Sequence, residues 1–234
     1  MPRETEIKLR IQNPKSLLRS LKKLGGTPSF PRVHEHNLLF DTPDGGLAKH
    51  GQLLRIRTET PAPGPVGAAL RDPSIRKLRT HTPKSPSRAL LTFKSPPEQL
   101  AIGAAVHPPP DRRYKVREEI ELVLTDAVSL QKIFEGLGLK GWFRYEKFRT
   151  SYRLPTRLSW AKELVIDLDE TPIGTFVELE GPGQAIDQAA RALGFSPSDY
   201  VLKNYLVLYL EECKRKGVQP THMLFAGRVV ISNR

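Results

Sequence analysis

The stretch Glu4-Thr5-Glu6-Ile7-Lys8-Leu9-Arg10-Ile11 decides the fold prediction, because charged and uncharged residues alternate in it without a break. A period of two residues is typical of a β-strand, whose successive side chains point to opposite faces. The charged face of such a strand lies either in solvent or inside a closed barrel. The choice depends on whether other segments repeat the pattern.

Other segments do repeat it. Arg55 and Arg57 alternate with Leu54 and Ile56, so both arginines share one face of a predicted strand. An antiparallel sheet with solvated charges fits this pattern. A closed barrel with a charged lumen fits it equally, since barrels point alternate residues inward. The remaining segments with charge on one side and apolar residues on the other are 91–94, 115–122, 147–149, 166–169 and 177–180.

The order of these pieces resembles the CYTH superfamily, also called triphosphate tunnel metalloenzymes. Glu4-x-Glu6-x-Lys8 resembles its ExExK signature, a weak signal by itself. The resemblance reaches from residue 1 to about 212. It implies an α+β fold, an eight-stranded antiparallel β-barrel that forms the triphosphate tunnel, with helices packed outside. The further matching pieces are Arg55-Ile-Arg57, Leu-Thr-Phe-Lys94, Arg117-Glu-Glu119-Ile-Glu121, Glu146-Lys147-Phe-Arg149, Ile166-Asp167, Glu178-Leu-Glu180-Gly181 and Lys203-Asn204-Tyr205.

The resemblance also implies a site inside the tunnel, with Glu6, Lys8 and Lys94 in catalytic roles. The residues implied to bind phosphate, for which the arginine fork is well suited, are Lys8, Arg55, Arg57, Lys94, Arg117, Lys147, Arg149 and Lys203. Carboxylate oxygens suit Mg²⁺ or Mn²⁺, and the residues implied to hold the metal are Glu4, Glu6, Glu119, Glu121, Asp167, Glu178 and Glu180. The alternative is a set of interior salt bridges without a ligand. We favour the site, because burying so many ions is costly.

Three functions stay open from the sequence. The first is divalent-metal-dependent hydrolysis of an inorganic or organic triphosphate, such as tripolyphosphate, ATP or thiamine triphosphate. The second is that of a class IV adenylyl cyclase, which makes cyclic AMP and pyrophosphate from ATP. The third is a non-catalytic polyphosphate-binding module. One position departs from the family pattern, since Leu39 stands where members often carry a tyrosine.

Composition limits the class of protein. With 37 Lys+Arg against 25 Asp+Glu, the net charge of +12 favours a polyanionic partner. Carboxylates among the cations disfavour a specific nucleic-acid interface. The single cysteine, Cys213, excludes an intramolecular disulfide. The charged first residues and the lack of a long apolar run predict a cytoplasmic protein without a membrane segment, as a monomer or homodimer.

We predict a tunnel domain over residues 1–213 and a basic C-terminal tail at 214–234. A Pro-rich insertion at 60–87, without an apolar pattern, interrupts the domain, and we expect it to be mobile. Helices are predicted from Asn13 to Leu24, from Asp126 to Leu137, over 184–193 and over 199–214. His34 and His36 share one strand face without an evident third ligand, and we assign them to the tunnel rim or the surface.

Overall fold

The computed structural model describes residues 3–63, 87–98 and 111–226. Most of the predicted insertion and the apolar run at 229–231 lie outside the described residues. The described chain forms a closed, eight-stranded antiparallel barrel, which confirms the predicted fold. The sheet runs in the order β7-β3-β4-β5-β6-β1-β9-β8 and closes by pairing β7 with β8. Its strands are β1 Arg3–Ile11, β3 Val33–Asp41, β4 Leu53–Pro61, β5 Arg88–Lys94, β6 Lys115–Leu124, β7 Lys140–Arg153, β8 Val165–Thr171 and β9 Gly174–Glu180. A short strand, β2 (Thr27–Pro28), adds to β7.

The strand register gathers the charged faces in the lumen. Lys8 lies beside Glu178, and Glu178 lies beside Asp167 on the next strand. Residues in register on neighbouring strands point to the same side of a sheet, so these charged side chains lie side by side on the inner wall of the barrel. The aliphatic residues that alternate with them face outward.

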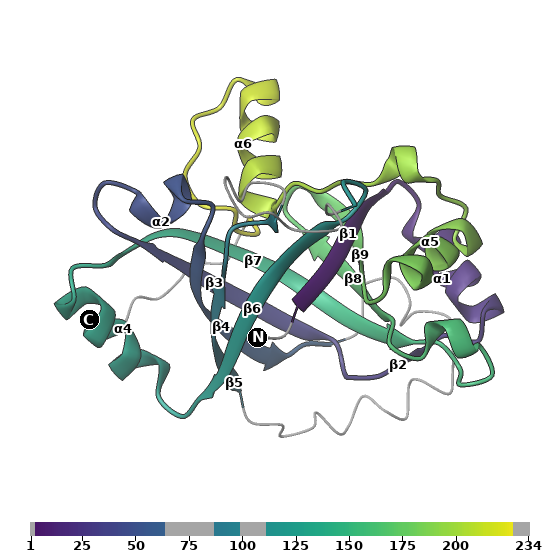
Figure 1. Cartoon of the computed structure of the whole chain (residues 1–234). Coiled ribbons are helices and arrows are strands. Elements are labelled where there is room, and N and C mark those ends of the chain that lie inside the picture. The colour runs from purple at the N-terminus through teal and green to yellow at the C-terminus, as the bar shows by residue number, and fades with distance from the viewer. Residues whose placement is uncertain (1–2, 64–86, 99–110, 227–234) are drawn as a thin grey trace.

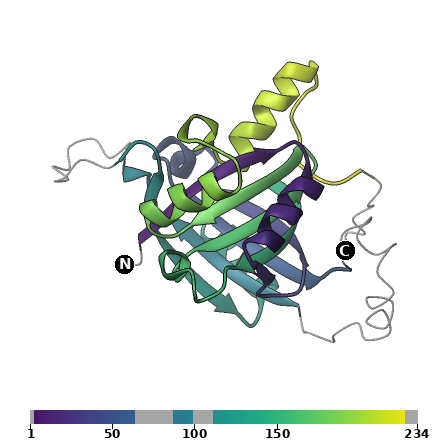
Figure 2. The same ribbon diagram turned by 90° about the vertical axis from the view of Figure 1, so that its right-hand side faces the viewer.

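Two helices cover the outer face of β1, β8 and β9. They are α1 (Pro14–Lys23) and α5 (Gly183–Ala192), which lie near each other in Figure 2. The Asn13 side chain accepts a hydrogen bond from the Ser16 backbone N–H and so caps α1, as the sequence predicts. Leu17 and Leu21 of α1 pack with Ile7 and Leu9 of β1 in the main hydrophobic core.

At another place outside the barrel, α4 (Ala127–Gly136) packs against Leu38 and Phe40 of β3 and Ile56 of β4, and lies at the lower left in Figure 1. Phe134 of this helix packs edge-on against Phe40, with ring centroids 5.1 Å apart. A single helical turn, α2 (Gly46–Lys49), joins β3 to β4. The Asp41 carboxylate accepts hydrogen bonds from the backbone N–H groups of Leu47 and Ala48, so the connection into β4 is fixed.

The last helix, α6 (Tyr205–Lys216), stands at one end of the barrel (Figure 1). Tyr205 and Leu208 pack there with Leu39, Phe143 and Phe176, which gives this end an apolar lining. The helix begins later than residue 199. Val201 is instead in a β-bridge with Lys8, and the Asn204 side chain caps the helix.

The chain after α6 returns to the barrel. Met223 forms a parallel bridge with Tyr145 of β7, through backbone hydrogen bonds to Arg144 and Glu146. The first three residues of the predicted tail, Lys214 to Lys216, form the last turn of α6. None of the helices in the described ranges is long and apolar enough to cross a membrane.

Candidate functional site

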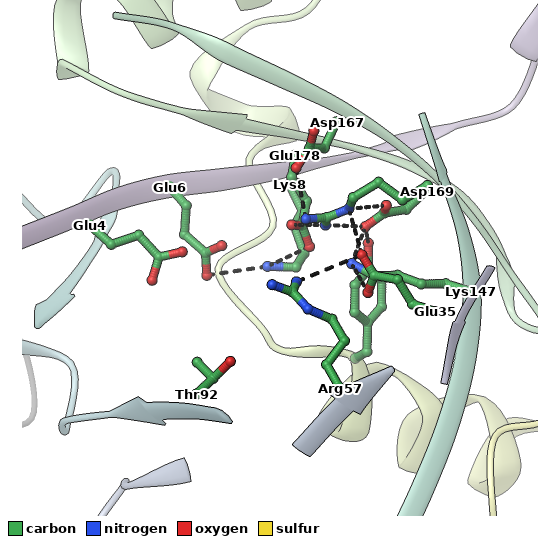
Figure 3. Close-up of polar contacts among 12 residues, drawn as sticks. Glu4, Glu6, Lys8, Glu35, Arg57, Thr92, Lys147, Asp167, Asp169 and Glu178 are labelled. Atoms are coloured by element: carbon green, nitrogen blue, oxygen red, sulfur yellow. Dashed lines mark hydrogen bonds and ion pairs between the residues drawn. The ribbon is translucent and has the colours of Figure 1, made fainter. Parts of the chain in front are cut away.

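The lumen encloses a cavity of about 430 Å³, here called the main cavity. Its wall carries charged side chains of both signs from many strands, such as Lys8 between Glu6 and Glu178 (Figure 3). Every cation that the sequence assigns to phosphate lies in this wall except Lys203. The cations of the wall are Arg3, Lys8, Arg55, Arg57, Lys94, Lys115, Arg117, Lys147 and Arg149.

Lys203 lies elsewhere. Its ammonium is 2.6 Å from the Glu211 carboxylate of α6, and its side chain is 54% exposed. Lys203 follows the bridge between Val201 and Lys8, which turns the chain at the barrel end before α6 begins. The neighbouring Asn204 and Tyr205 line the main cavity instead. The predicted Lys-Asn-Tyr motif therefore reaches the cavity through its last two residues.

The carboxylates predicted to hold metal also lie in the lumen. All of them line the main cavity except Asp167, which lines a second cavity described below. Asp167 is 2.7 Å from Arg149, whose guanidinium also contacts Asp169 at 2.7 Å and Glu178. Lys147 completes this cluster, 2.8 Å from Asp169. Arg149 therefore joins the carboxylates of β8 and β9.

The opposite part of the cavity is built around the start of β1. Lys94 contacts Glu4 at 2.7 Å and Glu119 at 2.6 Å. Glu6 contacts Lys115 at 2.8 Å and Lys8 at 3.3 Å. These pairs place each of the three residues predicted to be catalytic, Glu6, Lys8 and Lys94, in contact with a group of opposite charge.

The carboxylates of Glu4, Glu6, Glu119 and Glu180 gather at this place, here called the acid-rich end, among the cations Lys8, Lys94, Lys115 and Arg117. Burial and the neighbouring Glu6 and Glu119 carboxylates raise the pKa of Glu4 to about 8, although Lys94 opposes the shift. Glu180 is exposed as a residue at the end of β9, yet its side chain lines the cavity. Desolvation and the carboxylates of Asp167, Glu119 and Glu6 raise the pKa of Glu180 to about 7. No cation of the described chain forms an ion pair with Glu180.

This acid-rich end fits a divalent cation. Its oxygen donors are of the type that Mg²⁺ and Mn²⁺ prefer, and the raised pKa values show that added positive charge is favoured there. Within the described residues, no group of three His, Cys, Asp or Glu forms a complete metal site. An ion at this end would therefore take further ligands from water and phosphate, as Mg²⁺ commonly does.

Arg55 differs from the other cations. Its guanidinium donates to the Tyr145 hydroxyl at 2.8 Å and to the Thr92 hydroxyl at 3.1 Å. No carboxylate of the described chain lies within ion-pair distance of it. Tyr145 also supplies a phenol beside Leu39, the position where the sequence departs from the family pattern. Arg55 is thus held in place by neutral groups and keeps its charge available to an anion.

Sequence reasoning missed several residues of the site. Lys115 and Asp169 lie on the same strand faces as predicted residues, so the alternation could have found them. Glu35 alternates with His34 and His36 on β3. The inward face of β3 is the one that carries Glu35 and Leu39. Leu39 lines the main cavity and Glu35 lines the second cavity, while the two histidines lie on the opposite, outward face. Tyr205 belongs to the matched Lys203-Asn204-Tyr205 piece, but the sequence assigns it no role; α6, outside the barrel, inserts its hydroxyl 2.7 Å from the Asp169 carboxylate.

Comparison with known proteins agrees with this architecture. A family model described as the CYTH domain matches residues 2–197. The chain belongs to the CYTH family. Members of this family are enzymes that act on triphosphates, as triphosphatases or as adenylyl cyclases.

Individual CYTH relatives are distant in sequence. MJ0240 of Methanocaldococcus jannaschii, whose name proposes an adenylate cyclase, is 23% identical over 216 residues, which are 88% of this chain and 97% of the relative. A Vibrio parahaemolyticus structure, whose description also proposes an adenylate cyclase, has a TM-score of 0.59 at 18% identity and covers 88% of this chain and 96% of its own. The PH1819 structure from Pyrococcus horikoshii has a TM-score of 0.59 at 22% identity and covers 89% of this chain and 99% of its own. At these identities the solved structures show a shared fold.

The raised pKa of Glu4 predicts pH-dependent metal binding. Affinity for Mn²⁺ alone should rise by up to about tenfold per pH unit below pH 8, because the Glu4 carboxyl must lose its proton to bind a cation. Calorimetric titration between about pH 6 and pH 9 measures this slope. Glu4→Gln should bind more weakly and show a flatter slope. Equal wild-type affinity at all these pH values would contradict the prediction.

The same shift affects the stability of the metal-free protein. Between the ordinary pKa of 4.5 and the folded pKa of about 8, the folded state holds a proton on Glu4 that the unfolded state has released. The free energy of unfolding contributed by Glu4 therefore falls as pH rises through this window. Added metal should offset that loss.

Proposed function

We propose that the protein hydrolyses a triphosphate bound in the main cavity, with the help of a divalent metal ion. The observation that carries this proposal is the convergence of fixed cations on one cavity, at whose acid-rich end the Glu180 carboxylate has no ion-pair partner among the described residues. A triphosphate would match the cations along its length, since charge-assisted hydrogen bonds to phosphate are strong. The acid-rich end would match a metal bound to the same phosphates.

Glu4, Glu6, Glu178 and Glu180 are the residues that would hold Mg²⁺ or Mn²⁺. Bound there, the ion supplies Lewis-acid polarisation of a phosphoryl oxygen and positions water. The charged side chains of the cavity would supply the rest of catalysis. They neutralise the phosphates and align the phosphorus for attack, which is most of what phosphoryl transfer requires.

Lys8 is suited to a role as a cation rather than a base. Burial favours its neutral amine, but the Glu178 and Glu6 carboxylates raise the pKa of Lys8 above its ordinary value. Lys8 therefore stays protonated near neutral pH. It lies 3.4 Å from Glu178 and 3.3 Å from Glu6, so a phosphate oxygen would share its ammonium with these acids.

A second candidate is adenylyl cyclase activity. It is favoured by the apolar end of the main cavity, where Leu39, Leu53, Tyr145, Tyr205 and Leu206 line the wall. Aromatic and aliphatic surface of this kind accepts a nucleoside. In that reaction the ribose 3′-oxygen of ATP attacks the α-phosphorus, and pyrophosphate leaves. The cation set would serve either reaction.

A substrate panel separates the candidates. Purified protein with Mg²⁺ is incubated with tripolyphosphate, ATP and thiamine triphosphate, and orthophosphate, pyrophosphate and cyclic AMP are measured. We expect orthophosphate release that stops when EDTA removes the metal. Cyclic AMP with pyrophosphate would favour the cyclase instead. Tight binding of every compound without turnover would contradict both and support a binding module.

A further inference from the structure

The tunnel contains a second cavity of about 380 Å³, here called the rear cavity. Arg57 and Arg149 line both cavities, so these two side chains stand between them. The rear cavity opens beside apolar residues that include Phe30, which is 69% exposed. The two cavities are therefore neighbouring parts of one lumen, separated by a pair of guanidinium groups.

Glu35 holds this separation in place. The residue is fully buried on β3, and its carboxylate lies 3.7 Å from Arg57, 3.5 Å from Arg149 and 3.5 Å from Lys147 (Figure 3). Neither carboxylate oxygen has a hydrogen-bond partner among the described residues. Glu35 thus attracts three cations from β4 and β7 by charge alone, and its carboxylate oxygens form no hydrogen bond with them.

Three carboxylates line the space behind the two arginines, and the one further cation among the described residues of that lining is Arg88, at the exposed start of β5. Glu59 lines the rear cavity 3.2 Å from Arg57, and Asp167 lines it 2.7 Å from Arg149. Together with Glu35, these groups present carboxylate oxygens to the rear cavity. A phosphate anion offers only acceptor oxygens, so it cannot form hydrogen bonds with these carboxylates. A phosphate placed beside these carboxylates would meet like charge, which repels strongly in a partly desolvated lumen. The charges therefore favour phosphate in front of Arg57 and Arg149 over phosphate behind them.

We propose that Glu35 is a specificity-determining residue that ends the phosphate chain at Arg57 and Arg149 and so selects triphosphates over longer polyphosphates. This inference rests on the proposed function, because it takes the main cavity as the phosphate site. Glu35 acts in two ways. It keeps the arginines at the boundary, and its own charge opposes any phosphate that passes them.

The test compares binding of inorganic tripolyphosphate and tetrapolyphosphate by calorimetry in metal-free buffer. Wild type should prefer tripolyphosphate. Glu35→Gln keeps the volume and removes the charge, so the affinity ratio of tetra- to tripolyphosphate should rise by about tenfold or more. Glu35→Asp keeps the charge and should retain a ratio close to that of wild type.

The matched control is Glu170→Gln, on the outer face of β8. Glu170 also pairs with an arginine, Arg32, at 2.6 Å, but it lines neither cavity. Its ratio should equal that of wild type. An unchanged ratio in Glu35→Gln, or equal wild-type affinity for both compounds, would overturn the inference; the second measurement needs no variant to fold. Binding of tripolyphosphate without turnover would instead overturn only the proposed hydrolysis.

Discussion

Replacing Glu180 by glutamine is expected to lower metal-dependent turnover by at least about 100-fold while the melting temperature stays level or rises. Loss of even an indirect contact to a metal ligand commonly costs about 10–100-fold, and Glu180 is proposed as a direct ligand. Its carboxylate pairs with no described cation, and neighbouring acids disfavour its charge. Removing that charge from the metal-free protein therefore breaks no ion pair and relieves repulsion.

The measurements are kcat at saturating Mg²⁺ and thermal unfolding in EDTA. Glu118→Gln is the matched control, because Glu118 lies on β6 with an exposed position outside the cavity wall. It should match wild type in both measurements. Full turnover by Glu180→Gln would remove Glu180 from the metal site. A large fall in melting temperature would show that the carboxylate has a structural partner.

Two arginine variants are expected to lose activity, but only one of them is expected to lose much stability. Arg55→Ala should lower kcat/KM roughly 100-fold, as loss of a single preorganised donor does, with a small change in melting temperature. Arg149→Ala should lose activity and also about 3–5 kcal/mol of stability, which for a chain of this size lowers the melting temperature by on the order of 10 °C.

The difference follows from the partners of each residue. Arg55 bonds only neutral hydroxyl groups within the described chain, so its removal leaves no buried charge without a partner. Arg149 compensates Asp167, Asp169 and Glu178, and its removal leaves carboxylates uncompensated in the lumen. Arg144→Ala, on the exposed face of β7, is the control. Equal stability of the two lumen variants would contradict this reading of the ion pairs.

Alternation predicted the barrel well because it is a local property. Glu4, Glu6 and Lys8 must share a face in any strand, and the family resemblance indicated which face is inside. The same reasoning placed Arg55 with Arg57 and Glu178 with Glu180. Which residues of a strand share a face does not depend on the exact ends of the strand, so an error of one or two residues in its predicted bounds does not change the assignment.

What alternation could not supply was the set of contacts between strands. Glu35 meets Lys147 and Arg149 because β3 pairs with β7, a register that local sequence does not encode. Tyr205 enters the lumen from a helix outside the sheet, and Lys203 points away from it because a bridge between Val201 and Lys8 turns the chain. These placements depend on packing between distant segments.

The bridge at Met223 also protects an open edge of the barrel. β8 pairs with β7 only from Phe148 to Tyr152, so the edge of β7 around Arg144 and Glu146 has no strand neighbour from the barrel on that side. Met223 occupies it through backbone hydrogen bonds. Unpaired edges are templates for strand addition by other chains. We therefore expect that proteolytic cleavage after α6 would leave the barrel closed by its β7–β8 pairing but would expose this edge of β7 to strand addition by another chain.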